Sequence, residues 1–316
     1  MTTSEIAGTH RPLRLGTRKS PLAMAQAEMT AAALRNAHGW RTEQIELVPV
    51  IATGDKILDR PLADIGGKAL WTKELDAALA EGAIDAAVHS MKDVETDRPD
   101  IFLIAAMLPR ADVRDRLVGA ERISALRKGA IVGTASPRRR AQLLAQRPDL
   151  DIRLIRGNVQ TRLAKVESGE FAATLLAAAG LDRLGMADTG HALDITEMLP
   201  AASQGAIGIE CLRDAADVRR LLGAVDDRTT HLAVAAERAF LAGLGADCHS
   251  PVAVHATPAD GELQLTAQLL SPDGDEELRD VLMFQPADVR APGIFARAML
   301  GKAHPAIRAC FAGSDG

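Results

Sequence analysis

A strand–turn–helix pattern occurs twice in this chain, and it constrains the fold more than any other feature. Residues 13–28 read LRLGTRKSPLAMAQAE, and residues 129–146 read GAIVGTASPRRRAQLLAQ. In both, a short apolar run ends in Gly-Thr, and a Ser-Pro pair follows. Serine caps helix starts and proline fits the first helical position, so each copy predicts a strand, a turn and a helix. Two copies predict two α/β lobes of similar plan.

The segments around each copy add further β-α units, because short apolar runs alternate there with amphipathic stretches. Strands are expected over 44–53, 84–91, 151–157 and 171–179, and helices over 71–82 and 158–169. The last of these strands is expected to leave into a loop. A further strand over 203–213 is expected to return to the first lobe.

The C-terminal part of the sequence changes character and predicts a smaller α+β domain. We expect a helix over 229–245, a β-hairpin over 252–274 that turns at ADGE, and helical structure from residue 288. The predicted fold class is therefore α/β, with two α/β lobes and a smaller C-terminal α+β domain. The expected boundaries are 11–109 with 201–223 for the first lobe, 110–200 for the second, and 226–316 for the C-terminal domain.

The composition excludes several classes of function. Aromatic residues make up 3% of the chain, tyrosine is absent and the net charge is −5, all of which argue against a nucleic-acid partner. The N-terminus has no secretory apolar region, and no segment is apolar enough to span a membrane, so we expect a cytoplasmic protein. The three cysteines lie far apart, which indicates neither a disulfide framework nor a metal site.

Basic residues recur where strands give way to helices. Arg18 and Lys19 lie at the first helix start, Arg138 and Arg139 at the second, and Arg156 follows another strand. Positive charge is unfavourable at a helix N-terminus, so these arginines work against the local helix. Helix starts bind anions, and the planar guanidinium pairs with carboxylate or phosphate. The pattern favours an anion with several negative groups over a merely solvated surface.

A second polar cluster follows the strand in VHSMKDVETD. This strand delivers His89, Ser90, Lys92 and Asp93 at its carboxyl end, where α/β sheets bind ligands. Lys92 and Asp93 could also form a simple surface pair. A Ser-His-Asp triad is not indicated, because residues this close in sequence rarely reach triad geometry. LADIGGKALW is not a P-loop and GLGADC is not a dinucleotide fingerprint, so neither ATP nor NAD is supported.

Cys248 stands in LAGLGADCHSPV, a predicted loop between a helix and a strand. An accessible thiol there is a candidate nucleophile or attachment point, although a lone cysteine is more often buried and inert. Cys211 and Cys310 lie in more apolar segments and fit the inert role better.

These stretches together resemble one family, the porphobilinogen deaminases, also called hydroxymethylbilane synthases. The resemblance rests on GTRKSPLAMAQ, GDKILDRPLADIGGKALWTKEL, DAAVHSMKDV, VGTASPRRRAQL, RGNVQTRL, AAAGLDRLG, QGAIGIEC and AERAFLAGLGADC. It implies lobes similar to periplasmic binding proteins, and a covalent dipyrromethane cofactor. It also implies a transferase of porphyrin and haem biosynthesis, which condenses four porphobilinogen molecules into the linear tetrapyrrole hydroxymethylbilane and releases ammonia. The expected form is a monomer.

The resemblance also implies roles for individual residues. Asp93 matches the catalytic aspartate, as electrostatic stabiliser or general acid, and Cys248 matches the cysteine that holds the cofactor by a thioether. Each pyrrole unit carries an acetate and a propionate, and the matching carboxylate-binding residues are Arg18, Lys68, Lys92, Arg138, Arg139, Arg156, Arg162 and Arg183. The other expected site residues are Ser20, Gln26, Trp71, Ser90, Thr134, Ser136 and Gln204.

The chain departs from the family pattern at four places. Ala246-Asp247 replaces a Gly-Gly pair before Cys248, and Ser203 replaces a glycine before Gln204. Ala135 stands where serine is common, and Trp71 where phenylalanine is common. None of these changes removes a chemical group that the implied reaction needs.

Two other functions fit parts of the pattern. A two-lobed binding protein for a small carboxylate or phosphate explains the lobes and the arginines, but it leaves Cys248 and the C-terminal domain without a role. A transcriptional regulator with the same lobes would need a helix-turn-helix segment, which does not precede them.

Overall fold

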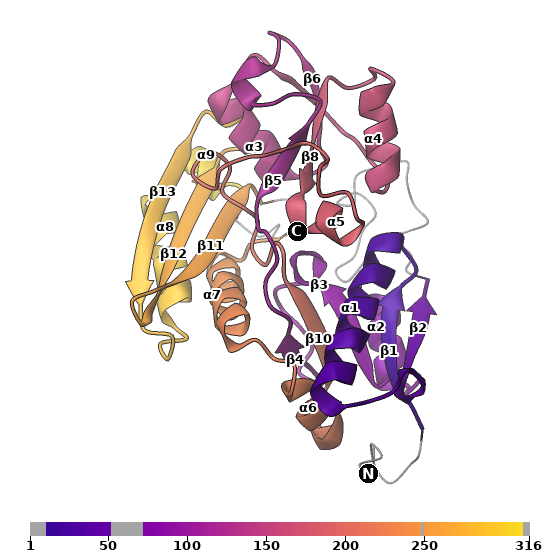
Figure 1. Ribbon diagram of the computed structural model, residues 1–316. Helices are drawn as coiled ribbons and strands as arrows, with labels where there is room; N and C mark the ends of the chain where they lie inside the picture. Colours follow the sequence, from indigo (N-terminus) through magenta and orange to yellow (C-terminus); the bar gives the residue numbers. More distant parts are fainter. Residues whose placement is uncertain (1–10, 52–71, 248–249, 312–316) are drawn as a thin grey trace. The chain divides into compact units, whose positions relative to one another are not determined.

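The computed structural model describes residues 11–51, 72–247 and 250–311 (Figure 1). Contacts divide these residues into two compact units. The first contains 11–51, 72–111 and 205–231, and the second contains 112–204, 232–247 and 250–311. The chain therefore passes between the units after residues 111, 204 and 231. Within the described ranges, no helix is long and apolar enough to cross a membrane.

The first unit is an α/β lobe built on one five-stranded sheet. Its strands are β1 (Leu13–Arg18), β2 (Ile45–Val50), β3 (Ala86–Ser90), β4 (Phe102–Met107) and β10 (Ile207–Leu212), and its helices are α1 (Pro21–His38), α2 (Lys73–Ala80) and α6 (Ala216–Gly223). The strand order is β2-β1-β3-β10-β4. β1 runs parallel to β2 and β3, whereas β10 is antiparallel to β3 and β4. The predicted return of a late strand to this lobe is confirmed by β10.

The second unit begins with a lobe of the same plan. Its strands are β5 (Asp115–Val118), β6 (Ile131–Gly133), β7 (Asp151–Arg153), β8 (Ala173–Ala177) and β9 (His191–Ala192), and its helices are α3 (Pro137–Gln146), α4 (Val159–Glu167) and α5 (Ala178–Arg183). The strand order is β7-β6-β8-β5-β9. β6 runs parallel to β7 and β8, and β5 is antiparallel to β8 and β9. The repeated sequence pattern therefore predicted two lobes of one plan correctly.

The glycine of each Gly-Thr pair lets the strand pack closely against its neighbours. A Cβ atom on Gly16 would lie 2.3 Å from Ile84, and one on Gly133 would lie 2.9 Å from Ile155. After each glycine the chain turns into a helix that Ser20 or Ser136 caps. The recurring Gly-Thr and Ser-Pro pairs thus have a packing reason and a capping reason.

The C-terminal domain completes the second unit, except that the first turn of its helix α7 belongs to the first unit. It contains α7 (Arg228–Leu244), β11 (Val252–Ala259), β12 (Glu262–Leu270), β13 (Glu277–Phe284), α8 (Ala291–Lys302) and α9 (Pro305–Arg308). The three strands form an antiparallel sheet, drawn in orange and yellow in Figure 1. Leu265 and Leu269 of β12 belong to one apolar core with Phe240 of α7 and Met299 of α8. Because strand side chains alternate, Gln268 points away from this core.

The predicted fold class is confirmed, but several elements differ from expectation. β7 ends at Arg153 instead of residue 157, and β8 leads directly into α5 instead of a loop. α5 packs against β8 and buries Ala178, Ala179 and Leu181, so tertiary burial extends the apolar run into a helix. The sequence patterns did not identify β4, β5, β9 or β13.

Candidate functional site

A cavity lies in the first lobe at the carboxyl ends of β1 and β3, beside the start of α1. Ligands bind α/β sheets at this edge, so the cavity is the candidate site of this unit. It is lined by Arg18, Ser20, Leu22, Ala23, Gln26, Thr72, Val88, His89, Ser90, Asp93 and Val94. The structure therefore brings together the predicted residues Arg18, Ser20, Gln26, Ser90 and Asp93.

Local backbone geometry places the polar side chains of this cavity. Ser20 caps α1 by accepting a hydrogen bond from the N–H of Ala23 at 3.3 Å. Ser90 ends β3 and accepts a hydrogen bond from Gln26 Nε2 at 2.7 Å. Asp93 ends the 3₁₀ turn Met91–Asp93 that follows β3. The cavity is thus bordered by a helix start, a serine–glutamine pair and a carboxylate on a short turn.

A buried ionic network lies beside this cavity. Arg98 contacts Asp76 Oδ1 at 2.6 Å and Glu210 Oε2 at 2.8 Å, and His89 Nε2 lies 3.1 Å from the same Glu210 oxygen. Burial raises the pKa of Glu210, but His89 and Arg98 outweigh it and lower that pKa to about 2. An ionised carboxylate only accepts hydrogen bonds, so His89 Nε2 is assigned as the donor. Sequence patterns missed this network because Arg98 and Glu210 are 112 positions apart in the chain.

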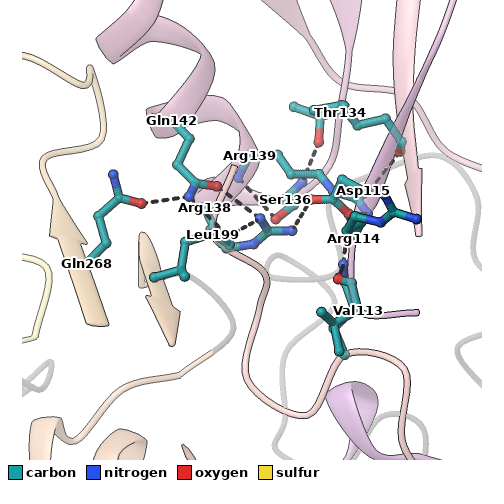
Figure 2. A network of polar contacts seen from close by, with 12 residues as sticks. Val113, Arg114, Asp115, Thr134, Ser136, Arg138, Arg139, Gln142, Leu199 and Gln268 are labelled. Carbon is teal, nitrogen blue, oxygen red and sulfur yellow. Dashed lines mark hydrogen bonds and ion pairs between the residues drawn. The ribbon is translucent and has the colours of Figure 1, made fainter. Parts of the chain in front are cut away.

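In the second lobe, the two arginines at the start of α3 meet a buried aspartate (Figure 2). Arg138 Nη2 donates to Asp115 Oδ2 at 2.8 Å, and Arg139 Nη2 donates to Asp115 Oδ1 at 2.6 Å. Gln204 Nε2 donates to Asp115 Oδ1 at 2.9 Å. Asp115 is 0% exposed, Arg138 4% and Arg139 7%. We call Asp115, Arg138, Arg139 and Gln204 the Asp115 cluster.

The Asp115 cluster changes the interpretation of the arginine triplet. Burial raises the pKa of Asp115, but the two guanidinium charges outweigh it and hold that pKa well below its usual range. Burial, together with the neighbouring Arg139 charge, lowers the pKa of Arg138. The two arginines are therefore buried in ion pairs with Asp115 and are not free cations at the helix start. Arg140 is exposed and donates to the main-chain oxygen of Ile152 at 3.1 Å.

The remaining second-lobe residues of the predicted site lie near strand ends and helix termini. Ser136 caps α3 by accepting from Arg139 N at 3.4 Å, and Thr134 Oγ1 accepts from Ser136 N at 3.1 Å. Arg162, in the first turn of α4, donates from Nε to Gly157 O at 2.9 Å. Arg183 ends α5, and burial lowers its pKa to about 10. Arg156 lies in the segment between β7 and α4.

Three predicted site residues, Lys68, Trp71 and Cys248, lie outside the described residues. Lys92 is exposed in the turn before Asp93. Within the described ranges, no group of His, Cys, Asp and Glu side chains is arranged to hold a metal ion.

The other two cysteines have weakly acidic thiols. Cys211 is 0% exposed on β10, and burial raises its pKa to about 11. Burial also raises the pKa of Cys310, whose Sγ lies 3.5 Å from the main-chain oxygen of Ala306. Only thiolates are good nucleophiles, so neither thiol is well suited to covalent chemistry.

Comparisons with known proteins agree with the resemblance seen in the sequence. The family model "Porphobilinogen deaminase, dipyromethane cofactor binding domain" matches residues 13–220, and "Porphobilinogen deaminase, C-terminal domain" matches residues 231–301. A porphobilinogen deaminase of Sphingopyxis alaskensis is 56% identical over 315 residues, which cover 98% of this chain and 99% of the relative. A porphobilinogen deaminase of Paracoccus denitrificans is 47% identical over 304 residues, or 95% of this chain and 97% of the relative.

Among solved structures, a TRAP periplasmic solute binding protein from Desulfovibrio salexigens aligns with a TM-score of 0.40 at 10% identity. The alignment covers 68% of this chain and 72% of that protein. The strand orders of the two sheets, and not this alignment, define the architecture of the two lobes.

Proposed function

The chain belongs to the porphobilinogen deaminase family, and we propose that it performs the family's reaction with Asp93 as catalytic residue and Cys248 as cofactor attachment site. This reaction joins four porphobilinogen molecules, with loss of ammonia, into the linear tetrapyrrole hydroxymethylbilane. The observation that carries the proposal is the first-lobe cavity, which brings Asp93 together with Arg18 and Ser90 at the strand ends.

The donors of both lobes fit a cofactor and a substrate that are rich in carboxylates. Arg18 and Ser20 line the first-lobe cavity. In the second lobe, the buried Nε atoms of Arg138 and Arg139 have no hydrogen-bond partner among the described residues. Buried donors of this kind call for an acceptor, and a carboxylate supplies one. When bound, the dipyrromethane cofactor supplies a free pyrrole α-carbon as nucleophile.

Asp93 is proposed to stabilise positive charge on the substrate. Loss of ammonia from porphobilinogen leaves a cation shared between the methylene carbon and the pyrrole ring. A fixed carboxylate lowers the energy of this charge and accepts a hydrogen bond from the pyrrole N–H. An aliphatic amine has a pKa of about 10, so it is already protonated at neutral pH and needs no acid in order to leave. We therefore assign Asp93 the electrostatic role instead of the general-acid role.

Cys248 is the proposed attachment site, and the other two cysteines support this choice by their own properties. Cys211 is buried inside the first-lobe core, and the pKa values of Cys211 and Cys310 are both raised by burial. Thioether formation needs a reactive thiol, which neither of them offers.

We further propose a cytoplasmic monomer without a nucleic-acid partner, divided at the boundaries given above into two lobes and a C-terminal domain. The net charge of −5 and the 3% aromatic content support the absence of a nucleic-acid partner. The position of β10 within the first sheet supports the assignment of residues 201–223 to the first lobe.

The intact mass of the denatured protein tests this proposal, followed by peptide mapping. The expected result is an excess equal to two porphobilinogen units less two ammonia molecules, located on the peptide that contains Cys248. A free-pyrrole aldehyde reagent should then colour the protein. An unmodified mass that persists after incubation with porphobilinogen would overturn the proposal and favour a binding protein for small carboxylates.

A further inference from the structure

We propose that Asp115 is a positioning residue, which orients Arg138 and Arg139 so that their Nε–H groups face a ligand carboxylate. This inference rests on the proposed function, because it concerns the carboxylates of cofactor and substrate. Asp115 lies in none of the sequence motifs, and its role follows from the contacts of the Asp115 cluster (Figure 2).

The described contacts of Arg138 and Arg139 leave their Nε–H groups without an acceptor. Each arginine donates from Nη2 to Asp115 and from Nη1 to a main-chain oxygen. Arg138 Nη1 donates to Leu199 O at 2.8 Å, and Arg139 Nη1 donates to Leu175 O at 2.8 Å. In contrast, Nε of each arginine is buried without a partner in the described part of the chain. An unmet buried donor is costly, so two of them in one buried cluster mark a site that a ligand completes.

The charges of the cluster fit one carboxylate. The arginines carry two positive charges and Asp115 carries one negative charge, and their described contacts include no other charged side chain. The buried group therefore keeps one net positive charge. A single ligand carboxylate neutralises this net charge. Without Asp115, the two guanidinium groups would repel each other at close range.

Asp115 also fixes the cluster to the surrounding chain. Gln204 Nε2 donates to Asp115 and, at 2.7 Å, to Val113 O, so it joins two segments of the second unit, one near residue 112 and one ending at residue 204. Gln142 donates to Leu199 O at 3.0 Å and to Gln268 of β12 at 2.6 Å. The orientation of both arginines thus depends on a carboxylate that the ligand itself would not touch.

The test compares Asp115→Asn with the control Asp112→Asn, which removes the half-buried partner of the exposed Arg114. Each variant is made in the natural protein, where intact mass gives the fraction loaded on Cys248. Each is also made with Cys248→Ala, where calorimetry gives the Kd of porphobilinogen without turnover. Circular dichroism and urea unfolding show whether each variant is folded at the assay temperature.

We expect Asp115→Asn to be folded, to raise the Kd at least tenfold and to lower the loaded fraction, while Asp112→Asn changes the Kd less than twofold. In a background with both Arg138→Gln and Arg139→Gln, Asp115→Asn should change the Kd less than twofold, because it acts through the two arginines. A folded Asp115→Asn protein with an unchanged or smaller Kd overturns the proposal.

If Asp115→Asn does not fold, Asp115→Glu is measured instead, because it keeps the charge and displaces the two carboxylate oxygens. The same changes in Kd and in loaded fraction are then expected, and an unchanged or smaller Kd overturns the proposal. Failure of the proposed function itself would look different. In that case the unsubstituted protein would carry no adduct, and its Cys248→Ala form would not bind porphobilinogen.

Discussion

Arg98 forms two hydrogen bonds with the carboxylate of Glu210, from Nε to Oε1 at 2.9 Å and from Nη2 to Oε2 at 2.8 Å. Glu210 is 0% exposed, and Arg98 comes from the segment that follows Asp93. A guanidinium that pairs with a carboxylate through two parallel bonds fixes both groups in direction as well as in distance. The pair therefore ties the chain just beyond the turn that holds Asp93 to β10, an interior strand of the first sheet.

Loss of this guanidinium should destabilise the protein markedly. We expect Arg98→Leu to lower the free energy of unfolding by about 3 kcal/mol, because the buried Glu210 charge loses its main partner. Urea unfolding at pH 7 measures the effect. The matched control is Arg114→Leu, whose partner Asp112 is a surface residue, with an expected loss of no more than about 0.5 kcal/mol. Equal losses for the two variants would contradict the prediction.

Glu210 should make stability depend on pH in the acid range. Its pKa is lowered from 4.5 to about 2 in the folded state, so its contribution is complete above pH 4.5 and is lost as the pH falls towards 2. The shift corresponds to roughly 3 kcal/mol as an upper limit. Unfolding free energies between pH 3 and pH 7 should fall less steeply with acid for Glu210→Gln than for the unsubstituted protein. Parallel curves would show that Glu210 titrates normally.

Removal of the Asp93 charge should abolish turnover without unfolding the protein. We expect Asp93→Asn and Asp93→Ala to lose nearly all activity, on the order of a thousandfold, because the substrate cation loses its counter-charge. Single-turnover assays and circular dichroism measure chemistry and folding separately. Asp97→Asn is the control, because Asp97 is exposed and does not line the cavity. A highly active Asp93→Asn variant would refute the electrostatic role.

Ser203 should be more stable as glycine. Its φ of 63° is left-handed, which costs a non-glycine residue about 1 kcal/mol, and its buried Oγ has no partner among the described residues. Ser203→Gly keeps the 2.6 Å hydrogen bond from the backbone N–H to Glu237, so we expect a gain of about 1 kcal/mol in thermal or urea unfolding. Asp260→Gly, at φ 48° in the β11–β12 turn, should gain less, because aspartate is favoured in such turns.

Two glycines of the C-terminal domain should respond in opposite directions to alanine. A Cβ atom on Gly243 of α7 would lie 2.6 Å from the main-chain oxygen of Gly293 in α8, so Gly243→Ala should cost about 1–3 kcal/mol. Gly301, in the last turn of α8, has nothing within 4 Å of the added carbon, so Gly301→Ala should gain about 0.5 kcal/mol. If both variants were destabilised, the close approach of α7 and α8 would not explain the loss of stability in Gly243→Ala.

Much of this architecture could be predicted from the sequence, because its signals are local. Ser20-Pro21 and Ser136-Pro137 mark helix starts by capping chemistry that acts within four residues, and the structure has a serine cap at both places. The same reasoning located the strand ends that bring Arg18, Ser90 and Asp93 to one cavity. In contrast, β5 has only four residues, and the alternation of its side chains does not predict that it pairs with β8 and β9.

The sequence by itself determined the two repeated lobes, the capped helix starts and the strand ends where polar residues gather, since each depends on residues that are neighbours in the chain. Only the tertiary structure decided what the buried charges contact. Asp115 lies 23 positions from Arg138, and Arg98 lies 112 positions from Glu210. Pairs this distant form because the fold buries both partners and a buried charge needs a counter-charge nearby, which no local pattern encodes.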